Sequence, residues 1–524
     1  MKARRILAIG IVASILLSLP LLAALFIGEH WRLFSFVPFD IFDWLSRVIP
    51  GYVITVVIDA MVRFIAFFNV GPTDIAAKII EQLMGIGIFI FLLAIIGFLN
   101  TWGVIRFSKK TFWIGLCSGL FLSFALIPIQ LFLRSPMSEN FSTAFALVIW
   151  AIVHAFFVRQ IISVQKPLTW LAGLTGFSVL LAGTLMIAGR AIPAGPEGLA
   201  MADRPLNEVR PSTEAFGVMK AAASAAQRSG IFPVPGTREE ITPNEKFFRI
   251  DINTLPPRIN LGKWKVRVEG LFTRARDLAF EDLMKYPEVT VAATLSCISN
   301  PVGGDLISTG FFTGVRLIDV LKDLGIRKEA KALEIRAEDG YYETVVYEDM
   351  IDPRTLLVYG LNGKTLSVEQ GFPLRIFIAN RYGMKQPKWI TQIKAVETID
   401  EGYWVERGWS FEAHPQTVSV IDIIVKTAQS DGTIPIGGIA WAGDRGIQKV
   451  EIQIDGGEWT EVKLLNPPLS PLAWVLWRYD WPFQPGRHTF RVRAVDGTGK
   501  IQAENRSDPH PAGATGYHQI EMTF

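Results

Sequence analysis

The sequence predicts a multi-domain protein: an N-terminal α-helical membrane bundle, then an α+β domain, then a β-sandwich of immunoglobulin-like size. Half of the 524 residues are hydrophobic and only 19% are charged, with a mean hydropathy of +0.31. Residues 1–190 hold 14 Lys and Arg against 7 Asp and Glu, whereas residues 191–524 hold 38 against 42. Toward the C-terminus the helical spacing of apolar residues gives way to short alternating strands. These contrasts indicate a lipid-embedded first part and a slightly acidic globular second part.

The first part contains five segments that are long and apolar enough to cross a bilayer, which takes about 20 apolar residues. None of them carries an ionised side chain, and they cover residues 6–27, 84–105, 111–133, 140–158 and 167–189. Residues 39–70 carry Asp59 and Arg63, which are costly inside lipid. We therefore predict one or two amphipathic, interfacial helices over 39–70, and membrane lipid as a partner of this part.

Basic residues set the predicted topology, because cytoplasmic loops are enriched in Lys and Arg. With five spans, the N-terminal cluster, the Arg106–Lys110 loop and the Arg159–Lys166 loop all fall on the cytoplasmic side. A sixth span over 51–70 would move Arg106–Lys110 outside. We therefore expect a multi-pass cell-membrane protein whose chain after residue 190 is extracytoplasmic.

Two histidines in or near the spans raise the question of a haem. His154 lies in the fourth predicted span and His30 just after the first, and a pair of histidines on facing helices can ligate haem. A single packed histidine is the more common outcome, so no haem is expected.

The second part divides into three pieces by composition and periodicity. Residues 191–243 are rich in Pro, Gly and Ala and read as a linker. Residues 244–411 mix alternating strands with helical spacing, as over Arg316–Leu324, and predict the α+β domain. In residues 412–524 alternation before Gly turns, as at Val450–Ile454, predicts the sandwich. Nucleic-acid binding is excluded, because no basic globular surface remains to meet phosphates.

The globular part contains few side chains that could bind a metal ion. Of the two cysteines, Cys117 lies in a predicted span and Cys297 in the α+β domain, so no disulfide joins them. A zinc site needs about four N or S ligands, which the globular part does not supply. Cys297 follows the apolar run Val289–Leu295 and opens a polar loop with two glycines, Ser296–Asp305. Such a loop at a strand end is a usual place for a site, although an isolated cysteine there is more often structural.

The sequence around this cysteine resembles the sulfite oxidase family of molybdopterin enzymes. The resemblance covers roughly residues 240–505 and rests on segments that agree in order and spacing. They are Asn244–Arg249, Thr294–Pro301, Phe312–Leu321, Gly371–Arg375, Tyr382–Trp389, Gly402–Trp404, Gly438–Trp441, Val450–Gly457 and Trp474–Trp477. It implies a sulfite-oxidase-type molybdopterin domain followed by a dimerisation-type domain, and hence a homodimer.

The resemblance also implies roles for individual residues. Cys297 takes the position of the thiolate that holds molybdenum, and a soft metal–sulfur bond requires such a ligand. Arg375 would grip the cofactor phosphate as a planar fork, and Lys385 and Lys388 as point charges. The resemblance also assigns Asn244, Phe248, Arg249 and Gln370 to cofactor binding, on weaker grounds.

One departure concerns the substrate. Sulfite-oxidising members have an arginine after the motif's asparagine, where this chain has Pro301. The basic pocket that sulfite needs is therefore in doubt.

We expect a membrane-anchored oxidoreductase that transfers an oxygen atom to or from a small molecule such as a sulfur or nitrogen oxide. No cytochrome-type domain is evident, so electrons would pass to or from a separate partner, a quinone or a cytochrome. The alternative is a membrane-tethered binding or sensing module that has lost the metal.

Overall fold

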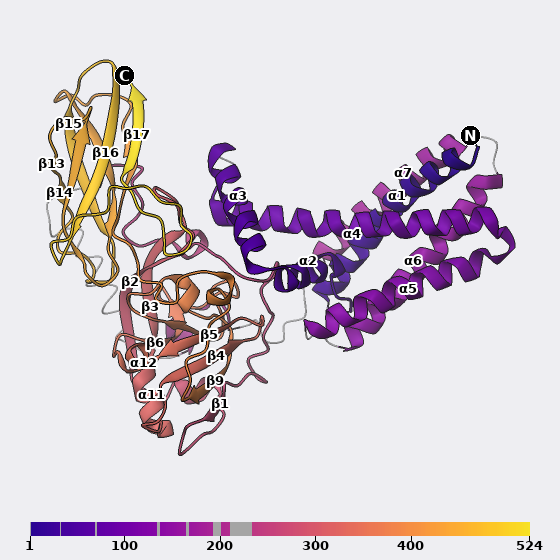
Figure 1. Cartoon of the computed structure of the whole chain (residues 1–524), viewed down its shortest axis with the longest axis horizontal. Coiled ribbons are helices and arrows are strands. Elements are labelled where there is room, and N and C mark those ends of the chain that lie inside the picture. The colour runs from indigo at the N-terminus through magenta and orange to yellow at the C-terminus, as the bar shows by residue number, and fades with distance from the viewer. Residues whose placement is uncertain are drawn as a thin grey trace. The chain divides into compact units, whose positions relative to one another are not determined.

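A computed structural model describes residues 2–31, 33–68, 71–133, 137–163, 167–191, 201–209 and 233–524 (Figure 1). The chain forms two compact units. Unit 1 comprises Met1–Pro50, Ala77–Glu197 and Ile252–Leu255, and unit 2 comprises Gly51–Ala76, Gly198–Asp251 and Pro256–Phe524. Most of the predicted linker 191–243 lies outside the described residues.

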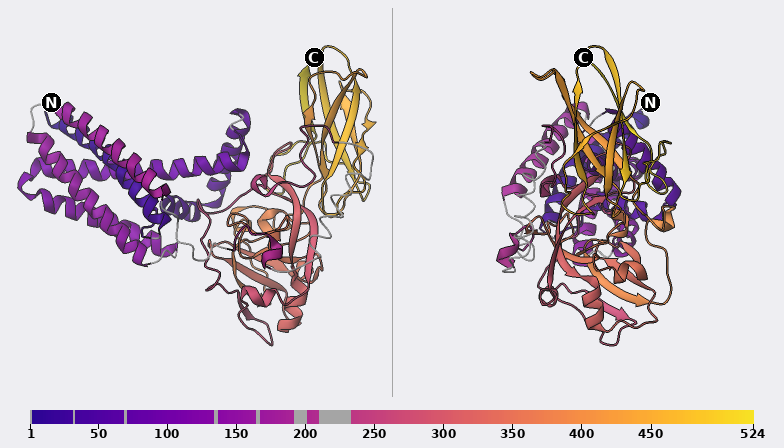
Figure 2. Two further views of the ribbon diagram at one scale, coloured as in Figure 1. Left: turned by 180° about the vertical axis from the view of Figure 1, so that it is seen from behind. Right: turned by 90° about the vertical axis from the view of Figure 1, so that its left-hand side faces the viewer.

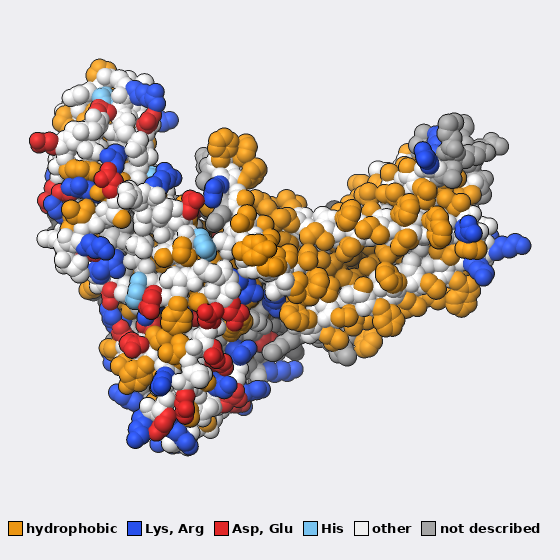
Figure 3. All heavy atoms as spheres, in the orientation of Figure 1, with side chains coloured by type: hydrophobic (Ala, Val, Ile, Leu, Met, Phe, Trp, Pro, Cys, Tyr) orange, Lys and Arg blue, Asp and Glu red, His pale blue; other side chains and the backbone are white. Residues whose placement is uncertain are grey.

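Unit 1 is built from long apolar helices. They are α1 (Lys2–His30), α2 (Val37–Val48), most of α4 (Thr73–Arg106), α5 (Thr111–Phe132), α6 (Met137–Ser163) and α7 (Pro167–Ala191). α1 packs against α6 and α7, and α5 packs along α6. Figure 3 shows hydrophobic side chains gathered over the outside of these helices, as expected for surfaces that face lipid.

Glycines set the close approach of α5 and α6. A Cβ at Gly115 would lie 2.6 Å from the Ile152 Cα, and one at Gly119 would lie 2.7 Å from the Val148 Cα. This spacing of small residues lets two apolar helices come into backbone contact, as is common between helices in membranes.

Four of the described helical stretches are long and apolar enough to cross a membrane: Arg4–Glu29, Thr73–Arg106, Ser108–Phe132 and Glu139–Ile162. The bent pair α2 and α3 (Gly51–Phe68) would make a fifth if it counted as one span. The fifth predicted span, 167–189, falls within α7, whose described apolar stretch Trp170–Leu185 is shorter. Helices α2 and α3 cover most of residues 39–70; that they are interfacial stays a prediction, and α3 is part of unit 2.

The α+β part of unit 2 contains two sheets. One has the order β1 (Arg267–Gly270), β9 (Ile390–Val396), β4 (Ala332–Ala337) and β5 (Tyr342–Val346). The other has the order β2 (Glu288–Ser296), β3 (Ile307–Arg316), β6 (Leu356–Leu361) and β7 (Lys364–Thr365), with β8 (Arg375–Phe377) also paired to β6. The predicted helix at Arg316–Leu324 is α11 (Leu317–Leu324), and its apolar residues at helical spacing are buried.

The C-terminal part contains two antiparallel four-stranded sheets (Figure 2). One sheet has the order β10 (Val418–Ile424), β11 (Thr433–Trp441), β15 (Val475–Pro482) and β14 (Lys463–Leu464). The other has the order β13 (Thr460–Glu461), β12 (Ile447–Ile454), β16 (Arg487–Asp496) and β17 (His518–Thr523). Residues from both sheets, such as Trp477 and Phe490, share one hydrophobic cluster. The alternation at Val450–Ile454 therefore predicted a strand correctly, while the immunoglobulin-like assignment stays a prediction.

Described pieces of the predicted linker pack on unit 2. Leu206, in the short helix α8 (Leu206–Val209), is buried in the main hydrophobic cluster of the α+β part. Thr365 Oγ1 donates a hydrogen bond of 2.6 Å to the Met201 carbonyl. These residues therefore add to the α+β fold, in addition to any tethering role.

Candidate active site

Cys297 stands directly after β2, at the start of the loop that leads to β3. Its backbone N–H donates to the Leu306 carbonyl at 2.9 Å, and the Leu306 N–H donates to Asn300 Oδ1 at 3.0 Å. These bonds close the loop at its base. The Cys297 side chain packs in a cluster with Phe247, Phe248 and other apolar residues.

The Cys297 thiol is buried beside a serine hydroxyl. Its Sγ lies 3.0 Å from Ser299 Oγ. Burial raises the pKa of the thiol above its ordinary value, and hydrogen bonds at Ser299 act in the opposite direction. Burial therefore keeps this residue a protonated thiol at neutral pH, and a bound metal would stabilise its thiolate.

A cluster of cations lies around one carboxylate in the same domain. Arg249 and Lys388 both form ion pairs with Asp251, whose side chain is fully buried. Arg375, on β8, is 3% exposed, and its Nη1 donates to Gln370 Oε1 at 3.2 Å. Asp74 Oδ2 also accepts from the Arg249 backbone N–H at 2.8 Å, so among these residues three cations face two carboxylates and leave a surplus of positive charge.

Burial, more than the neighbouring charges, changes the pKa values of these cations. Burial lowers the pKa of Arg375 to about 10, partly offset by Asp251. Burial also lowers the pKa of Lys388 to about 8, and the charges of Arg375 and Arg249 lower it further while Asp251 raises it. Among the described residues, Arg375 Nε and Arg249 Nη2 are buried without a hydrogen-bond partner. Unpaired buried donors with excess positive charge fit an anionic phosphate.

Gln370 connects this cation cluster to the cluster around Cys297. Its Nε2 donates to the Phe247 carbonyl at 3.0 Å, next to Phe248, and its Oε1 accepts from Arg375. The Phe248 N–H in turn donates to Ser308 Oγ at 3.1 Å on β3. The structure thus brings Phe248, Arg249, Gln370, Arg375 and Lys388 together.

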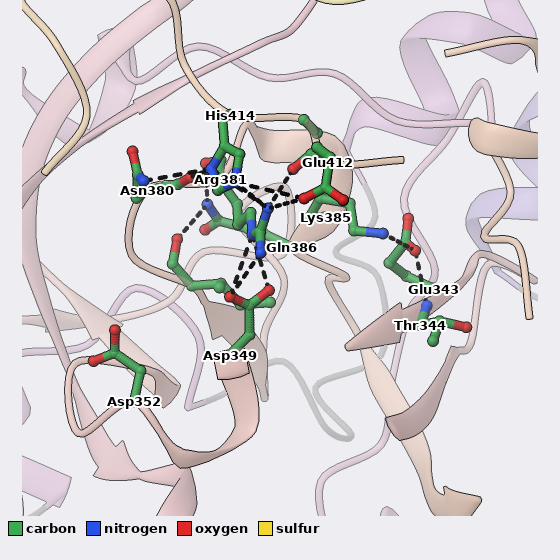
Figure 4. A network of polar contacts seen from close by, with 12 residues as sticks. Glu343, Thr344, Asp349, Asp352, Asn380, Arg381, Lys385, Gln386, Glu412 and His414 are labelled. Carbon is green, nitrogen blue, oxygen red and sulfur yellow. Dashed lines mark hydrogen bonds and ion pairs between the residues drawn. The ribbon is translucent and has the colours of Figure 1, made fainter. Parts of the chain in front are cut away.

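The remaining two predicted residues have other partners. Asn244 bonds with Asn362 at 2.7 Å and with the Leu361 carbonyl at 3.2 Å. Lys385 Nζ lies 2.5 Å from Glu343 Oε1 (Figure 4). The same Nζ also lies over the Phe411 ring. Lys385 therefore already has a counter-ion, whereas Arg375 forms no ion pair with the residues that the structure describes.

Sequence reasoning missed the two carboxylates that organise these cations. Glu343 precedes Lys385 by 42 residues, and its pKa is raised by burial although Lys385 lowers it. Asp251 is 137 residues from Lys388. No local spacing could have indicated either pair, because both arise only when distant segments fold together.

Two tyrosines lie near the cysteine. Tyr341 donates a hydrogen bond to the Met384 carbonyl, and the Tyr382 hydroxyl accepts one from the Gln416 N–H at 3.0 Å. Burial, with a smaller contribution from a Cys297 thiolate, raises the pKa of Tyr382 to about 12 and that of Tyr341 well above its ordinary value. Both phenols remain protonated across the physiological range; Tyr341 already donates its proton to Met384, whereas Tyr382 accepts from Gln416 and can still donate.

A second polar network borders this region (Figure 4). Arg381 Nε donates to Asp349 Oδ2 at 2.9 Å, and its Nη1 donates to the Glu412 carbonyl at 2.6 Å. Arg381 Nη1 also lies 2.9 Å from His414 Nε2. This network joins the end of the α+β part to the segment that leads into the sandwich, and it holds the Arg381–Gln386 loop in place.

The donor set limits the metals that this part of the chain can bind. Among the described residues, no group of three or more His, Cys, Asp or Glu side chains could hold a metal ion. A metal at Cys297 would therefore take one thiolate from the protein and its other ligands from a cofactor. A dithiolene cofactor with a terminal phosphate fits this thiolate together with the cation cluster.

Comparison with known families agrees with this chemistry. Residues 253–404 match the "oxidoreductase molybdopterin binding domain", and residues 413–509 match the "Mo-co oxidoreductase dimerisation domain". Sulfite oxidase from Arabidopsis thaliana is 26% identical over 330 residues, which covers 51% of this chain and 83% of that protein. Sulfite oxidase from Gallus gallus is 26% identical over 316 residues, covering 51% and 68%.

A solved structure is similar as well. The sulfane dehydrogenase SoxCD from Paracoccus pantotrophus is 19% identical with a TM-score of 0.48, covering 56% of this chain and 89% of that one. The two family domains define a molybdenum cofactor-dependent oxidoreductase. Residues 253–509 belong to the sulfite oxidase family of molybdopterin enzymes, as their motifs predicted.

Proposed function

We propose that this protein is a membrane-anchored molybdopterin oxidoreductase that transfers an oxygen atom to or from a small substrate such as a sulfur or nitrogen oxide. The observation that carries the proposal is the buried Cys297, connected through Phe248 and Gln370 to a cation cluster with unpaired donors. When bound, the cofactor supplies two-electron molybdenum chemistry.

The chain's own residues have separate roles in this proposal. Cys297 provides the thiolate ligand. Arg375, Lys388 and Arg249 bind the cofactor phosphate, and Gln370 orients Arg375. Phe248 and Asn244 shape the cofactor's surroundings, and Lys385 acts with Glu343 in holding the pocket wall. Tyr382, whose hydroxyl accepts from Gln416 and can still donate, is a candidate for donating a hydrogen bond to a bound oxide.

The charges near the cysteine loop favour a neutral oxide over sulfite. Position 301 is proline, and Arg238, which donates to the Gly304 carbonyl at 3.0 Å, is paired with Asp422 at 3.1 Å. Lys385 is likewise paired, with Glu343. A dianion would find no uncompensated cation on these residues, whereas an S-oxide or N-oxide needs only hydrogen-bond donors.

The long apolar helices of unit 1 support membrane anchoring, and the positions of basic residues support an extracytoplasmic catalytic unit. The dimerisation-type domain supports a homodimer. The electron partner would be a separate quinone or cytochrome. Protease treatment of intact vesicles should cut within 191–243 from the extracytoplasmic side; cutting only from the cytoplasmic side would reverse this orientation.

Molybdenum content tests the central claim. The full chain, purified from a host that makes the cofactor, should contain stoichiometric molybdenum and turn over an S-oxide or N-oxide with an artificial electron donor. Cys297→Ala should lose both, whereas Cys117→Ala, the matched control, should keep both. A metal-free wild-type protein would instead support the non-catalytic binding module.

A further inference from the structure

Helix α3 is attached to the catalytic unit along one side. Gly51 approaches Arg407 so closely that a Cβ would lie 2.6 Å from the Arg407 Cα. Arg63 pairs with Asp508 at 3.3 Å, and Ile65 is 1% exposed. These contacts place α3 in unit 2 together with η5 (Val405–Arg407).

The other side of α3 is apolar and exposed. Its side chains recur at helical spacing, and Phe67 is 82% exposed. We call this surface the α3 face; it consists of Tyr52, Val56, Val57, Phe64, Phe67 and Phe68. Exposed apolar surface of this extent on one helix marks an interaction site.

The chain on either side of α3 indicates what covers this face. α2 ends at Val48, three positions before α3 begins, and α4 begins at Thr73, five positions after α3 ends. α4 is long and apolar enough to cross a membrane. A helix with an apolar, aromatic-rich face that is joined this closely to a span has the bilayer as its nearest apolar phase.

We propose that the α3 face is inserted into the boundary between lipid headgroups and acyl chains, so that the catalytic unit itself docks on the membrane surface. The inner side of α3 contacts η5, and Trp404 and Val405 pack against the cluster of Ile298, Tyr382 and Trp409. Lipid docking therefore holds the wall beside Cys297 close to the bilayer, where a membrane-bound electron partner is accessible. The proposal rests on membrane anchoring but not on molybdenum binding.

Spin labels on the full chain in phosphatidylcholine–phosphatidylglycerol vesicles test this docking. The background variant is Cys117→Ser, because Cys297 is buried and Cys117 is exposed. Single cysteines are introduced at Tyr52→Cys and Phe67→Cys on the α3 face. Phe121→Cys, exposed on α5, reports the span, and Lys463→Cys, on β14, reports water. Collisions with dissolved oxygen and with a water-soluble nickel chelate are measured for each label.

Labels at Tyr52→Cys and Phe67→Cys should collide more with oxygen than with nickel, at similar depths. The label at Lys463→Cys should show the reverse preference. Greater nickel access at Phe67→Cys would overturn the proposal, as would protection from both reagents with spin–spin broadening, which indicates a second copy. A large depth difference between the two α3 labels would indicate a span and would also overturn it. Loss of oxygen preference at Phe121→Cys would refute membrane anchoring itself, so the two failures are distinguishable.

Discussion

Lys385 and Glu343 form an ion pair in which the lysine side chain is 3% exposed and the glutamate side chain is fully buried. Glu343 Oε1 also accepts a hydrogen bond from the Thr344 N–H at 2.8 Å. Both charged groups are buried away from water, so removing either one would leave the other as an uncompensated buried charge. Lys385 therefore has a structural role in the α+β part.

Breaking this pair should destabilise the protein strongly. Lys385→Met leaves a buried carboxylate without its cation and should cost about 3–5 kcal/mol. The double variant Lys385→Met/Glu343→Met should recover most of that loss, since neither charge remains. Guanidinium titration followed by tryptophan fluorescence in detergent measures both. Arg354→Met, at a partly exposed pair with Asp352, is the control and should cost no more than about 1 kcal/mol. Equal, small effects from all three variants would contradict a structural role for the pair.

Arg375 should control cofactor retention and not folding. Hydrogen bonds to charged groups contribute about 1.5–3 kcal/mol, so Arg375→Gln should lower molybdenum content at limiting cofactor by about tenfold or more. Elemental analysis of the purified protein measures this. Arg276→Gln removes an arginine from an exposed ion pair and should leave the metal content unchanged. Full molybdenum occupancy in Arg375→Gln would show that the cofactor phosphate binds elsewhere.

Anion binding by the cofactor-free protein should weaken as pH rises through about 8. Burial lowers the pKa of Lys388 to about 8, so the cluster loses this positive charge above that pH. Equilibrium dialysis with radiolabelled inorganic phosphate, between roughly pH 7.5 and 9.5, measures the affinity; phosphate itself is a dianion throughout most of this range. Lys388→Met should bind more weakly and show a flat profile. A wild-type profile equally flat would exclude Lys388 from the anion site.

The sandwich should unfold independently of the α+β part. Phe490 is fully buried between the two sheets, so Phe490→Ala should destabilise the sandwich by about 3–5 kcal/mol. Phe483→Ala, at a site that is 40% exposed, serves as the control. Limited proteolysis should cut the C-terminal part of Phe490→Ala first, while molybdenum stays bound. Simultaneous loss of the metal would show that the two parts unfold as one.

Local patterns explain which features could be predicted. The cysteine at a strand end, the helix Leu317–Leu324 and the alternating strand Ile447–Ile454 all depend on neighbouring residues, and the sequence indicated each. Glu343 and Asp251 were missed because their partners lie 42 and 137 residues away. The assignment of α3 to the catalytic unit also depends on distant contacts, such as that of Arg63 with Asp508, which periodicity alone does not show.

The hydrogen bonds that join Cys297, Asn300 and Leu306 also bear on how such an enzyme can diversify. They fix both ends of the loop through the backbone of Cys297 and Leu306 and the side chain of Asn300. Pro301 and Val302 lie inside this closed loop, so their side chains can be exchanged while the sulfur keeps its position, whereas a Cβ at Gly303 or Gly304 would clash with His518 or Asn300. Selection could retune what the pocket accepts here, with the proline at 301 as one such outcome, without rebuilding the metal ligand.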